Sequence, residues 1–360
     1  MMNADGIAKR AGESVEVKYV LDIRDFPDLP YADRFVKDID IILNDPEVEI
    51  VAEVIGGLKP AYDFVSRALK AGKSVVTSNK ELVAAKGAEL LQTAKENGAL
   101  FLFEASVGGG IPIIRPMAQC LAANEVERVT GILNGTTNYI LTRMFREHQP
   151  FDVALRSAQE LGYAEADPTA DVEGIDACRK ICILASLAFG RHVYPQYVHA
   201  EGISSLTAAD VEMAAKEDRV IKLLGITRKY EDGSVFAMVA PFAISRSHLL
   251  AGVEDVFNGI VVKGNAVDEV AFVGRGAGKL PTASAVVADI IDCVKHRGGE
   301  NMMKWDDCPD NIIRNWEDER FRRLVRLAGE AEHRVTEPMN EAEFAAAFAG
   351  KTVESAVRML

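Results

Sequence analysis

The first hundred residues alternate between short apolar runs and longer stretches in which apolar residues recur with helical spacing. Strands are predicted by the short, β-branched runs at 16–22, 50–55, 74–77 and 100–103. Helices are predicted over 80–97 and after Pro60, which falls in a first turn where its missing N–H costs nothing. Strands that alternate with helices of this length predict an α/β fold with a doubly wound parallel sheet.

The pattern changes after residue 110, and several helices are expected between about 137 and 225. The last of them, over 207–224, has amphipathic spacing, with Thr207 as N-cap and Asp210 in its first turn. Further strands are predicted at 226–230, 235–239, 259–263 and 269–273, the first two flanking a hairpin signal at 231–234. Helices over an antiparallel sheet predict a separate α+β domain for substrate binding and dimerisation.

These patterns predict three parts of the chain. A Rossmann-type nucleotide-binding domain is expected at 1–109 and 276–300, because a helix over 282–296 returns to it. The substrate-binding and dimerisation domain is expected at 110–275. A charged linker over roughly 298–319 leads into a short tail, placed at 312–360.

Composition narrows the class of protein. Nearly half of the 360 residues are apolar (48%), which suffices for a sizeable core, and the formal charge of −13 comes without a basic stripe for nucleic acid. The five cysteines form no C-x-x-C pair, and such an odd, scattered set suits a reducing compartment. No apolar run approaches the length of a membrane span, and the N-terminus lacks a secretory apolar region. We therefore expect a cytoplasmic protein without nucleic-acid or membrane partners.

A Rossmann domain opens with a strand, a G-x-G-x-x-G loop and a helix whose N-terminus holds the pyrophosphate. This chain has no such opening, since the residues through Gly12 predict the end of a helix that leads into the strand at 16–22. We expect the first strand and its glycine loop to lie before residue 1, which leaves the nucleotide-binding domain incomplete. A later run, Gly274-Arg-Gly-Ala-Gly-Lys-Leu280, fits neither the dinucleotide nor the P-loop spacing, and predicts a glycine-rich turn near the cofactor.

Three segments carry residues suited to chemistry. Thr77-Ser78-Asn79-Lys80 follows a predicted strand, at the sheet edge where α/β proteins bind ligands, although a lone lysine there is more often an exposed helix start. The segment 103–112 combines Glu104 with three consecutive glycines. Its backbone carbonyls suit a hard cation, and a flexible interdomain hinge explains the glycines equally well.

The third segment, 162–180, concentrates five carboxylates, at Glu165, Asp167, Asp171, Glu173 and Asp176. Lys180 follows Asp176 by four residues, so the two share a helix face. A solvated acidic loop is the usual meaning of such a run. Here, however, the helix continues into the apolar run 181–189 and must be substantially buried. Acids for an ammonium and a lysine for an oxygen would suit an amino-acid substrate.

Six segments, in order and spacing, resemble homoserine dehydrogenase; together they cover roughly residues 15–300. They are 53–57, 77–80, 103–112, 134–138 (Asn-Gly-Thr-Thr-Asn), 162–180 and 274–285. The resemblance implies hydride transfer between NAD(P)H and aspartate semialdehyde to give L-homoserine, in threonine, methionine and isoleucine biosynthesis. A homodimer is expected on the sheet over 225–273, because its predicted strands need a second layer to cover them. The resemblance implies the following positions: for catalysis Lys180, Lys80 and Asp176; for substrate binding Glu165 and Asp171; for the cofactor Gly56, Gly57, Thr77, Asn79, Lys80 and Gly278; and for a sodium ion Glu104 with Val107, Gly109 and Ile111.

The sequence departs from the family pattern inside the chain and at both of its ends. Ala170 stands where some members carry an acid, and the glycine fingerprint is absent. Many members also end in a βαββαβ regulatory domain of the ACT type. Here a strand at 322–327, a helix at 341–348 and a last strand at 353–360 predict a degenerate ACT-like tail.

The alternatives concern activity and cofactor. Asp22, at the end of the second predicted strand, suits the ribose diol of NAD, and Arg24 suits the 2′-phosphate of NADP, which is slightly favoured. A non-catalytic or crippled dimeric paralogue would lack a working nucleotide site, but the intact lysines and acids argue against it. A different semialdehyde or hydroxy-acid dehydrogenase would have to carry the 162–180 segment by accident.

Overall fold

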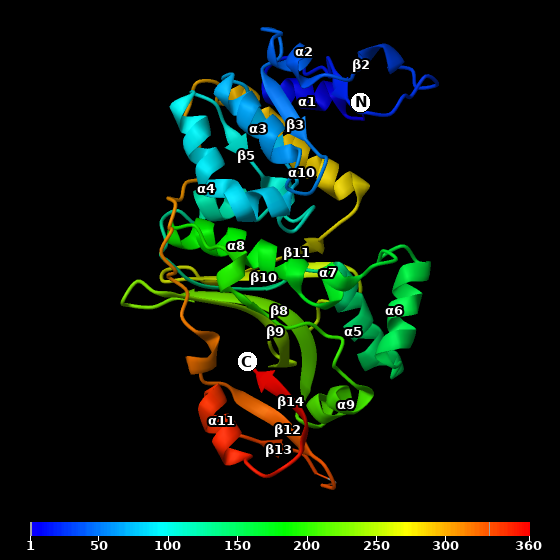
Figure 1. Ribbon diagram of the computed structural model, residues 1–360, viewed down its shortest axis with the longest axis vertical. Coiled ribbons are helices and arrows are strands. Elements are labelled where there is room, and N and C mark those ends of the chain that lie inside the picture. Colours follow the sequence, from blue (N-terminus) through cyan, green and yellow to red (C-terminus); the bar gives the residue numbers. More distant parts are fainter. Residues whose placement is uncertain (1, 331) are drawn as a thin grey trace.

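The computed structural model describes residues 2–330 and 332–360. Figure 1 shows an elongated molecule in which the N-terminal nucleotide-binding part lies above a large curved sheet, with the C-terminal tail below. The predicted fold class is confirmed: a parallel-stranded Rossmann-like part is joined to an α+β part with a mixed sheet. Of the helices in the described residues, none has the length and apolar character that crossing a membrane requires.

A three-stranded parallel sheet forms the centre of the nucleotide-binding part. Its order is β3 (Ile50–Glu53), β4 (Ser74–Thr77) and β5 (Phe101–Leu102). The covering helices are α3 (Ala61–Lys70), α4 (Lys80–Glu96) and the returning α10 (Lys279–Lys295). Val75 and Val76 are fully buried between these layers. The predictions for this region are confirmed to within a few residues at each end.

The N-terminal segment forms a second, smaller parallel sheet of β1 (Val20–Leu21) and β2 (Phe35–Val36), flanked by α1 (Ala4–Ala11) and α2 (Ile39–Leu43). The helix expected before Gly12 is confirmed, and Gly12 ends it with φ 92°. The strand predicted over 16–22 is reduced to two residues. Among the described strands, β1 pairs only with β2 and β3 only with β4, so the parallel strands form two separate sheets.

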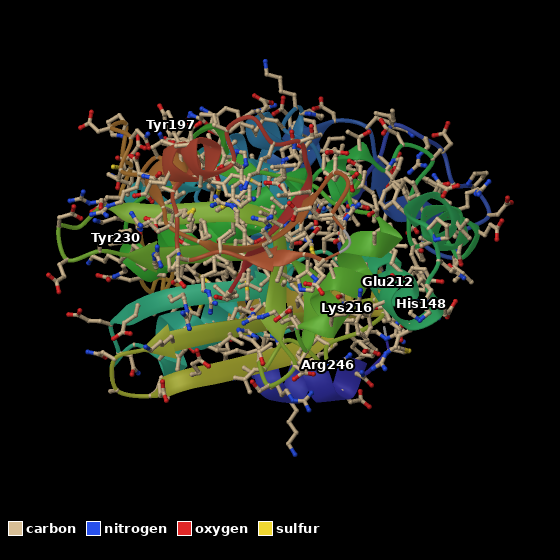
Figure 2. The ribbon with its side chains drawn as sticks, turned by 90° about the horizontal axis from the view of Figure 1, so that it is seen from below. His148, Tyr197, Glu212, Lys216, Tyr230 and Arg246 are labelled. Atoms are coloured by element: carbon tan, nitrogen blue, oxygen red, sulfur yellow. The ribbon has the colours of Figure 1, made fainter. Side chains whose placement is uncertain are left out.

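A nine-stranded mixed sheet forms the body of the substrate part. Its strands are β6 (Val126–Ile132), β7 (His199–Ala200), β8 (Arg219–Lys229), β9 (Val235–Ser245), β10 (Phe257–Gly264), β11 (Asp268–Arg275) and the tail strands β12 (Arg322–Leu327), β13 (Arg334–Val335) and β14 (Val353–Met359). The order is β11-β10-β6-β8-β9-β14-β12-β13, with β7 on β9. The hairpin predicted at 231–234 joins β8 to β9. Tyr230 marks its tip in the view from below (Figure 2), across the molecule from Glu212 and Lys216.

The helix predicted over 207–224 is wrong in its second half. Only α9 (Ala208–Lys216) is helical, with Thr207 as its N-cap and Asp210 in its first turn as predicted, and the two side chains form a capping box. Asp218 adopts a left-handed φ of 54°, and the chain then enters β8. Both faces of β8 are buried, so its apolar residues run without alternation, and such a run cannot be told from a buried helix by spacing.

Four helices belong to the α+β part: α5 (Gly135–Glu147), α6 (Phe151–Glu160), α7 (Thr169–Val172) and α8 (Ile175–Phe189). Figure 1 shows α8 lying between the sheet and α4 of the nucleotide-binding part. Ile181, Cys182 and Leu184 of α8 are fully buried there. The predicted burial of the apolar run 181–189 is thus confirmed over most of its length, and α8 carries its acids and lysine to the boundary between the parts.

The C-terminal tail extends the large sheet. Its predicted elements are confirmed as β12, α11 (Glu341–Ala347) and β14. β14 pairs in parallel with β9 through Arg358↔Phe242, so the tail adds strands to the same sheet. Arg358 Nη1 donates to Glu201 Oε2 at 2.6 Å across this junction. The tail is therefore packed against the substrate part through both backbone and charge.

Candidate active site at the boundary of the two parts

The ends of β3 and β4 are joined by buried polar side chains. Thr77, fully buried, donates from Oγ1 to Glu53 Oε2 at 2.6 Å. Asn79 caps α4 by accepting from Leu82 N at 3.1 Å, and its Nδ2 donates to Gly57 O at 2.7 Å. The side chains of Thr77 and Asn79 therefore hold the loop at 56–57 against the start of α4.

The loop after β3 presents an open backbone surface. Gly56 and Gly57 have φ of 82° and 70°, and a Cβ added at either would meet no atom within 4 Å. Glu53 Oε1 accepts from Ile55 N at 2.7 Å and from Gly56 N at 3.2 Å, which fixes the turn. Sequence reasoning assigned no role to Glu53, although it opens the 53–57 motif.

Asp176, almost fully buried near the start of α8, lies between two lysines. Its Oδ1 is 2.9 Å from Lys80 Nζ, and its Oδ2 is 2.6 Å from Lys180 Nζ. Lys180 Nζ also donates to Leu133 O at 2.8 Å. An ammonium has three hydrogens, so Lys180 keeps one donor for a bound molecule. The structure thus brings together the three residues predicted for catalysis.

Charge decides the state of Asp176. Burial alone would raise the pKa of this carboxyl, but the positive charges of Lys180 and Lys80 lower it below the ordinary range. Asp176 is therefore ionised at neutral pH. A fixed carboxylate beside two lysines keeps both ammonium groups oriented.

Asp171 joins this cluster, and Glu165 does not. Asn134 Nδ2 donates to Asp171 Oδ1 at 2.8 Å and to Asp176 Oδ2 at 2.9 Å. The side chain of Glu165 is exposed, and only its backbone carbonyl takes part in a hydrogen bond, from Gln159 at 3.1 Å. The sequence did not single out Asn134, whose only signal was its place at the head of the Asn-Gly-Thr-Thr-Asn segment.

Gly278, the remaining predicted cofactor residue, has φ of 124° and precedes α10. The turn that leads to it packs on the glycine loop at 108–111, because Gly110 N donates to Arg275 O at 3.0 Å. A Cβ on Gly109 would lie 2.4 Å from Gly276 O, so this contact requires glycine. The predicted glycine-rich turn therefore lies against the predicted cation loop.

The Glu104 carboxylate is occupied by backbone donors. Its oxygens accept from Ile113 N at 2.6 Å, Ile114 N at 3.0 Å and Arg115 N at 2.7 Å. The backbone N–H of Glu104 donates to Asp289 Oδ2 at 2.8 Å. Burial raises the pKa of Asp289 to about 7, although Arg115 lies beside it. Asp289, one of two acids in the apolar stretch of α10, was missed by sequence reasoning.

The carbonyls of Val107, Gly109 and Ile111 have a different environment. In the described chain, no backbone or side-chain donor bonds any of these three oxygens, although all three residues are buried. Among the same described residues, no three His, Cys, Asp or Glu side chains cluster closely enough to hold a metal ion. A cation held in this loop would therefore depend on backbone oxygens.

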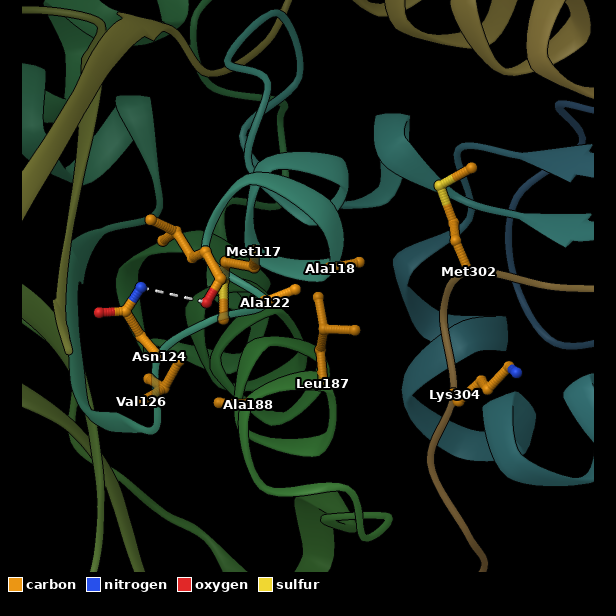
Figure 3. A pocket seen from close by; sticks show the side chains of 10 residues that line it. Met117, Ala118, Ala122, Asn124, Val126, Leu187, Ala188, Met302 and Lys304 are labelled. Carbon is orange, nitrogen blue, oxygen red and sulfur yellow. Dashed lines mark hydrogen bonds between the residues drawn. The ribbon is translucent and has the colours of Figure 1, made fainter. Parts of the chain in front are cut away.

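A cavity of about 190 Å³ lies apart from this cluster (Figure 3). Met117, Leu121, Leu187 and Met302 contribute apolar side chains to its wall, and Lys304 lies at its edge. None of the predicted site residues lines it. The cavity is therefore separate from the lysine–carboxylate cluster and supplies none of its groups.

The fold and the lysine–carboxylate cluster fit one class of protein, the dehydrogenases built on a Rossmann-type nucleotide-binding domain. Residues 4–104 match the family model described as homoserine dehydrogenase, NAD binding domain, and residues 112–291 match that described as homoserine dehydrogenase. The chain belongs to the homoserine dehydrogenase family.

Named relatives agree with this assignment. The chain is similar to homoserine dehydrogenase of Synechocystis, at 48% identity over 71% of this chain and 60% of that protein. It is similar to that of Bacillus subtilis at 42% identity over 81% of this chain and 68% of that protein. The chain therefore spans about two thirds or less of the length of these relatives.

Solved structures are similar over most or all of the chain. The crystal structure of a homoserine dehydrogenase from Thiobacillus denitrificans matches with a TM-score of 0.90 and 36% identity, covering 100% of this chain and 93% of that one. A hyperthermophilic archaeal homoserine dehydrogenase, solved in complex with NADPH, matches with a TM-score of 0.64 and 28% identity over 82% of each chain. The similarity to the Thiobacillus structure includes the tail.

Proposed function

We propose that this chain interconverts aspartate semialdehyde and L-homoserine, with a nicotinamide dinucleotide as the hydride carrier. The observation that carries the proposal is the Asp176 carboxylate held between Lys80 and Lys180, where α8 of the substrate part meets α4 of the nucleotide-binding part. Family membership identifies the substrate pair. Aspartate semialdehyde-dependent oxidation of NADPH or NADH by the purified chain tests it.

The proposed chemistry assigns a proton to Lys180. The bound cofactor supplies the hydride, which adds to the aldehyde carbon and leaves negative charge on its oxygen. Lys180 stabilises that charge with its remaining N–H and then donates the proton, giving the hydroxyl of homoserine. Asp176 and Lys80 hold Lys180 in place, supported by the 2.6 Å and 2.9 Å contacts of Asp176.

The acids are proposed to bind the substrate ammonium. Asp171 is the better placed, because Asn134 ties it to the catalytic cluster. Glu165 would complete the site from the exposed loop before α7, where its side chain is free to turn toward a ligand. The distribution of roles predicts that Asp171 acts on ground-state binding and Lys180 on the chemical step.

The cofactor is proposed to lie along the edge formed by Gly56, Gly57, Thr77, Asn79 and Lys80, with Gly278 facing it. The open surface at Gly56 and Gly57 supports this placement, because a flat ligand can approach the backbone there. The buried Thr77 and Asn79 would act by holding that loop. The described residues before β1 contain no glycine-rich phosphate loop, so no residue is assigned to the pyrophosphate.

We propose a preference for NADP over NAD. Arg24 Nη2 pairs with Asp22 Oδ2 at 2.9 Å, just beyond β1. Hydrogen bonds from Arg24 lower the pKa of Asp22 to about 2, so its carboxylate is already engaged when a ribose diol arrives. The Arg24 side chain is 73% exposed and free to meet a 2′-phosphate.

Arg24→Ala should lower kcat/KM with NADPH by about tenfold or more, the scale of a charge-assisted hydrogen bond to phosphate. With NADH the change should stay within about twofold, because that cofactor lacks the 2′-phosphate. Steady-state kinetics with both cofactors measures the effect, and Arg10→Ala on the exposed face of α1 serves as control. Equal losses with both cofactors would contradict the assignment.

A sodium ion is proposed at the loop 104–111. The three buried carbonyls without donors, on Val107, Gly109 and Ile111, support it, since hard cations prefer such oxygens. Glu104 would contribute charge or its backbone, because its carboxylate oxygens already accept three N–H groups. Sodium chloride should raise the melting temperature above that in choline chloride at equal ionic strength, and identical melts would argue against the site.

A homodimer is proposed on the sheet at 225–273, within a substrate and dimerisation domain at 110–275. In the same proposal, the domain at 1–109 and 276–300 would bind the nucleotide, and 312–360 would form a degenerate ACT-like tail. Exposed apolar residues on the edge strand β11, Val273 at 56% among them, support a partner there. Light scattering should give twice the 39.1 kDa chain mass, and a monomer at micromolar concentration would count against it.

A cytoplasmic location is also proposed. Its support is that all five cysteines are free, as expected in a reducing compartment. Recovery of the native protein mainly from a secreted or membrane fraction would contradict it.

A further inference from the structure

Asn134 occupies the junction between β6 and α5, and its amide has a defined orientation. Its Oδ1 accepts from Thr137 N at 2.9 Å, which makes it the N-cap of α5. This acceptor role identifies which amide atom is oxygen, an assignment that amides often leave ambiguous. Nδ2 must therefore point away from α5.

Both hydrogens of that Nδ2 are used on acids. One bond goes to Asp171 Oδ1 at 2.8 Å and the other to Asp176 Oδ2 at 2.9 Å. The adjacent carbonyl, on Leu133, accepts from Lys180 Nζ at 2.8 Å. Two consecutive residues of one junction thus bond the proposed ammonium-binding acid, the central carboxylate and the proposed proton donor.

We propose that Asn134 is a positioning residue that fixes the distance between the substrate ammonium and the aldehyde oxygen. The inference rests on the proposed function. Asp171 would hold one end of the substrate and Lys180 the other. Among the described side chains, only Asn134 bonds both Asp171 and Asp176, the partner of Lys180. Its loss should therefore weaken binding and slow the chemical step together.

A purely structural role as helix cap is the competing explanation. Substitutions that keep the cap separate the two, because Asp and Ser are N-caps about as good as Asn. Asn134→Asp keeps the acceptor for Thr137 N and replaces the donors by a carboxylate. Asn134→Ser keeps a shorter acceptor and lacks the reach to either acid. Neither variant should lower the melting temperature as far as loss of the cap would.

The pH dependence of Asn134→Asp provides the decisive readout. The charged groups that face this position are Asp171 of α7, Asp176 and Lys180 of α8, and Lys80 of α4. Two carboxylates within direct hydrogen-bond distance raise the pKa of an introduced carboxyl. Below that raised pKa the carboxyl is protonated and again donates one hydrogen bond, and above it the donor is lost.

Wild type, Asn134→Asp and Asn134→Ser should be compared from about pH 5.5 to 9, by steady-state kinetics and by calorimetric binding of L-homoserine. For Asn134→Ser we expect kcat/KM to fall about tenfold to a hundredfold at every pH, through both kcat and KM. For Asn134→Asp, relative to wild type, turnover and homoserine affinity should both recover as the pH falls, by about fivefold or more.

An active wild type whose Asn134→Asp variant keeps a constant ratio to it across this pH range would overturn the inference. So would a Ser variant with normal kinetics, or one in which only the melting temperature changes. A wild type that binds homoserine without turning it over would contradict the proposed function alone. In that case the binding arm still tests Asn134, because homoserine affinity in the Asp variant should follow the same pH dependence.

Discussion

Lys180→Met should lower kcat by about a hundredfold or more while the protein stays folded. The expected scale is that of removing a group that donates a proton and stabilises developing charge. Methionine keeps an unbranched apolar stem of similar length in the buried site, so the change removes mainly the ammonium. KM should change far less than kcat, because Lys180 is assigned to the transition state. Initial rates of aspartate semialdehyde reduction measure both.

A second buried lysine provides the matched control. Lys222 of β8 is 4% exposed. Its Nζ donates to Val253 O at 2.6 Å and to Asn138 Oδ1 at 3.1 Å, and not to Asp171 or Asp176. Burial lowers the pKa of Lys222 to about 8. Lys222→Met should destabilise the protein comparably and leave kcat near normal. If folded Lys180→Met turns over normally, the proton-donor role passes to Lys80.

The Asp176→Asn variant is predicted to lose both activity and stability. The amide has the shape of the carboxylate but leaves Lys180 buried without a counter-ion, and breaking a buried pair in this way costs about 3 kcal/mol or more. Activity should fall by about a hundredfold, since neither lysine keeps its partner. Urea unfolding at pH 7 and steady-state rates measure the two effects.

The pH dependence of the loss in stability follows from the lowered pKa of Asp176 in the folded protein. In the unfolded chain an aspartate titrates near about 3.9. The stabilisation is therefore complete above this value and disappears as the pH falls toward the lower folded pKa. The stability gap between wild type and Asp176→Asn should be flat from about pH 9 to 5 and narrow below about 4. Asp167→Asn should show a much smaller gap, because the pKa of this exposed carboxyl is lowered by hydrogen bonds from Thr169 and no buried ion pair is broken.

Local sequence patterns were sufficient to predict a helix or strand where one of its faces is buried and where capping or flanking residues mark its ends. The strand 74–77 and the helix from Lys80 were predicted almost residue for residue, because Asn79 caps the helix and short apolar runs flank it. The first half of β8, 219–224, was misassigned to a helix because a strand buried on both faces has no alternation. β6 was not predicted, although it places Leu133 and Asn134 in the site.

Helical spacing in the sequence predicts only those contacts of the site that lie within one helix. Asp176 and Lys180 lie four residues apart on α8, so their pairing follows from sequence. The contact of Lys80 with the same carboxylate joins residues nearly a hundred positions apart and requires the packing of α4 on α8. Asn134 and Glu53 act through hydrogen bonds across the fold, which no spacing along the chain reveals.

The most direct test of the proposed activity is a reaction balance on the purified chain. Aspartate semialdehyde and NADPH are incubated with wild type and with Lys180→Met, and NADPH oxidation and homoserine are measured together. The account predicts one homoserine formed for each NADPH oxidised by wild type, and a rate about a hundredfold lower in the variant. Oxidation by wild type no faster than by Lys180→Met, or oxidation without homoserine, would contradict it.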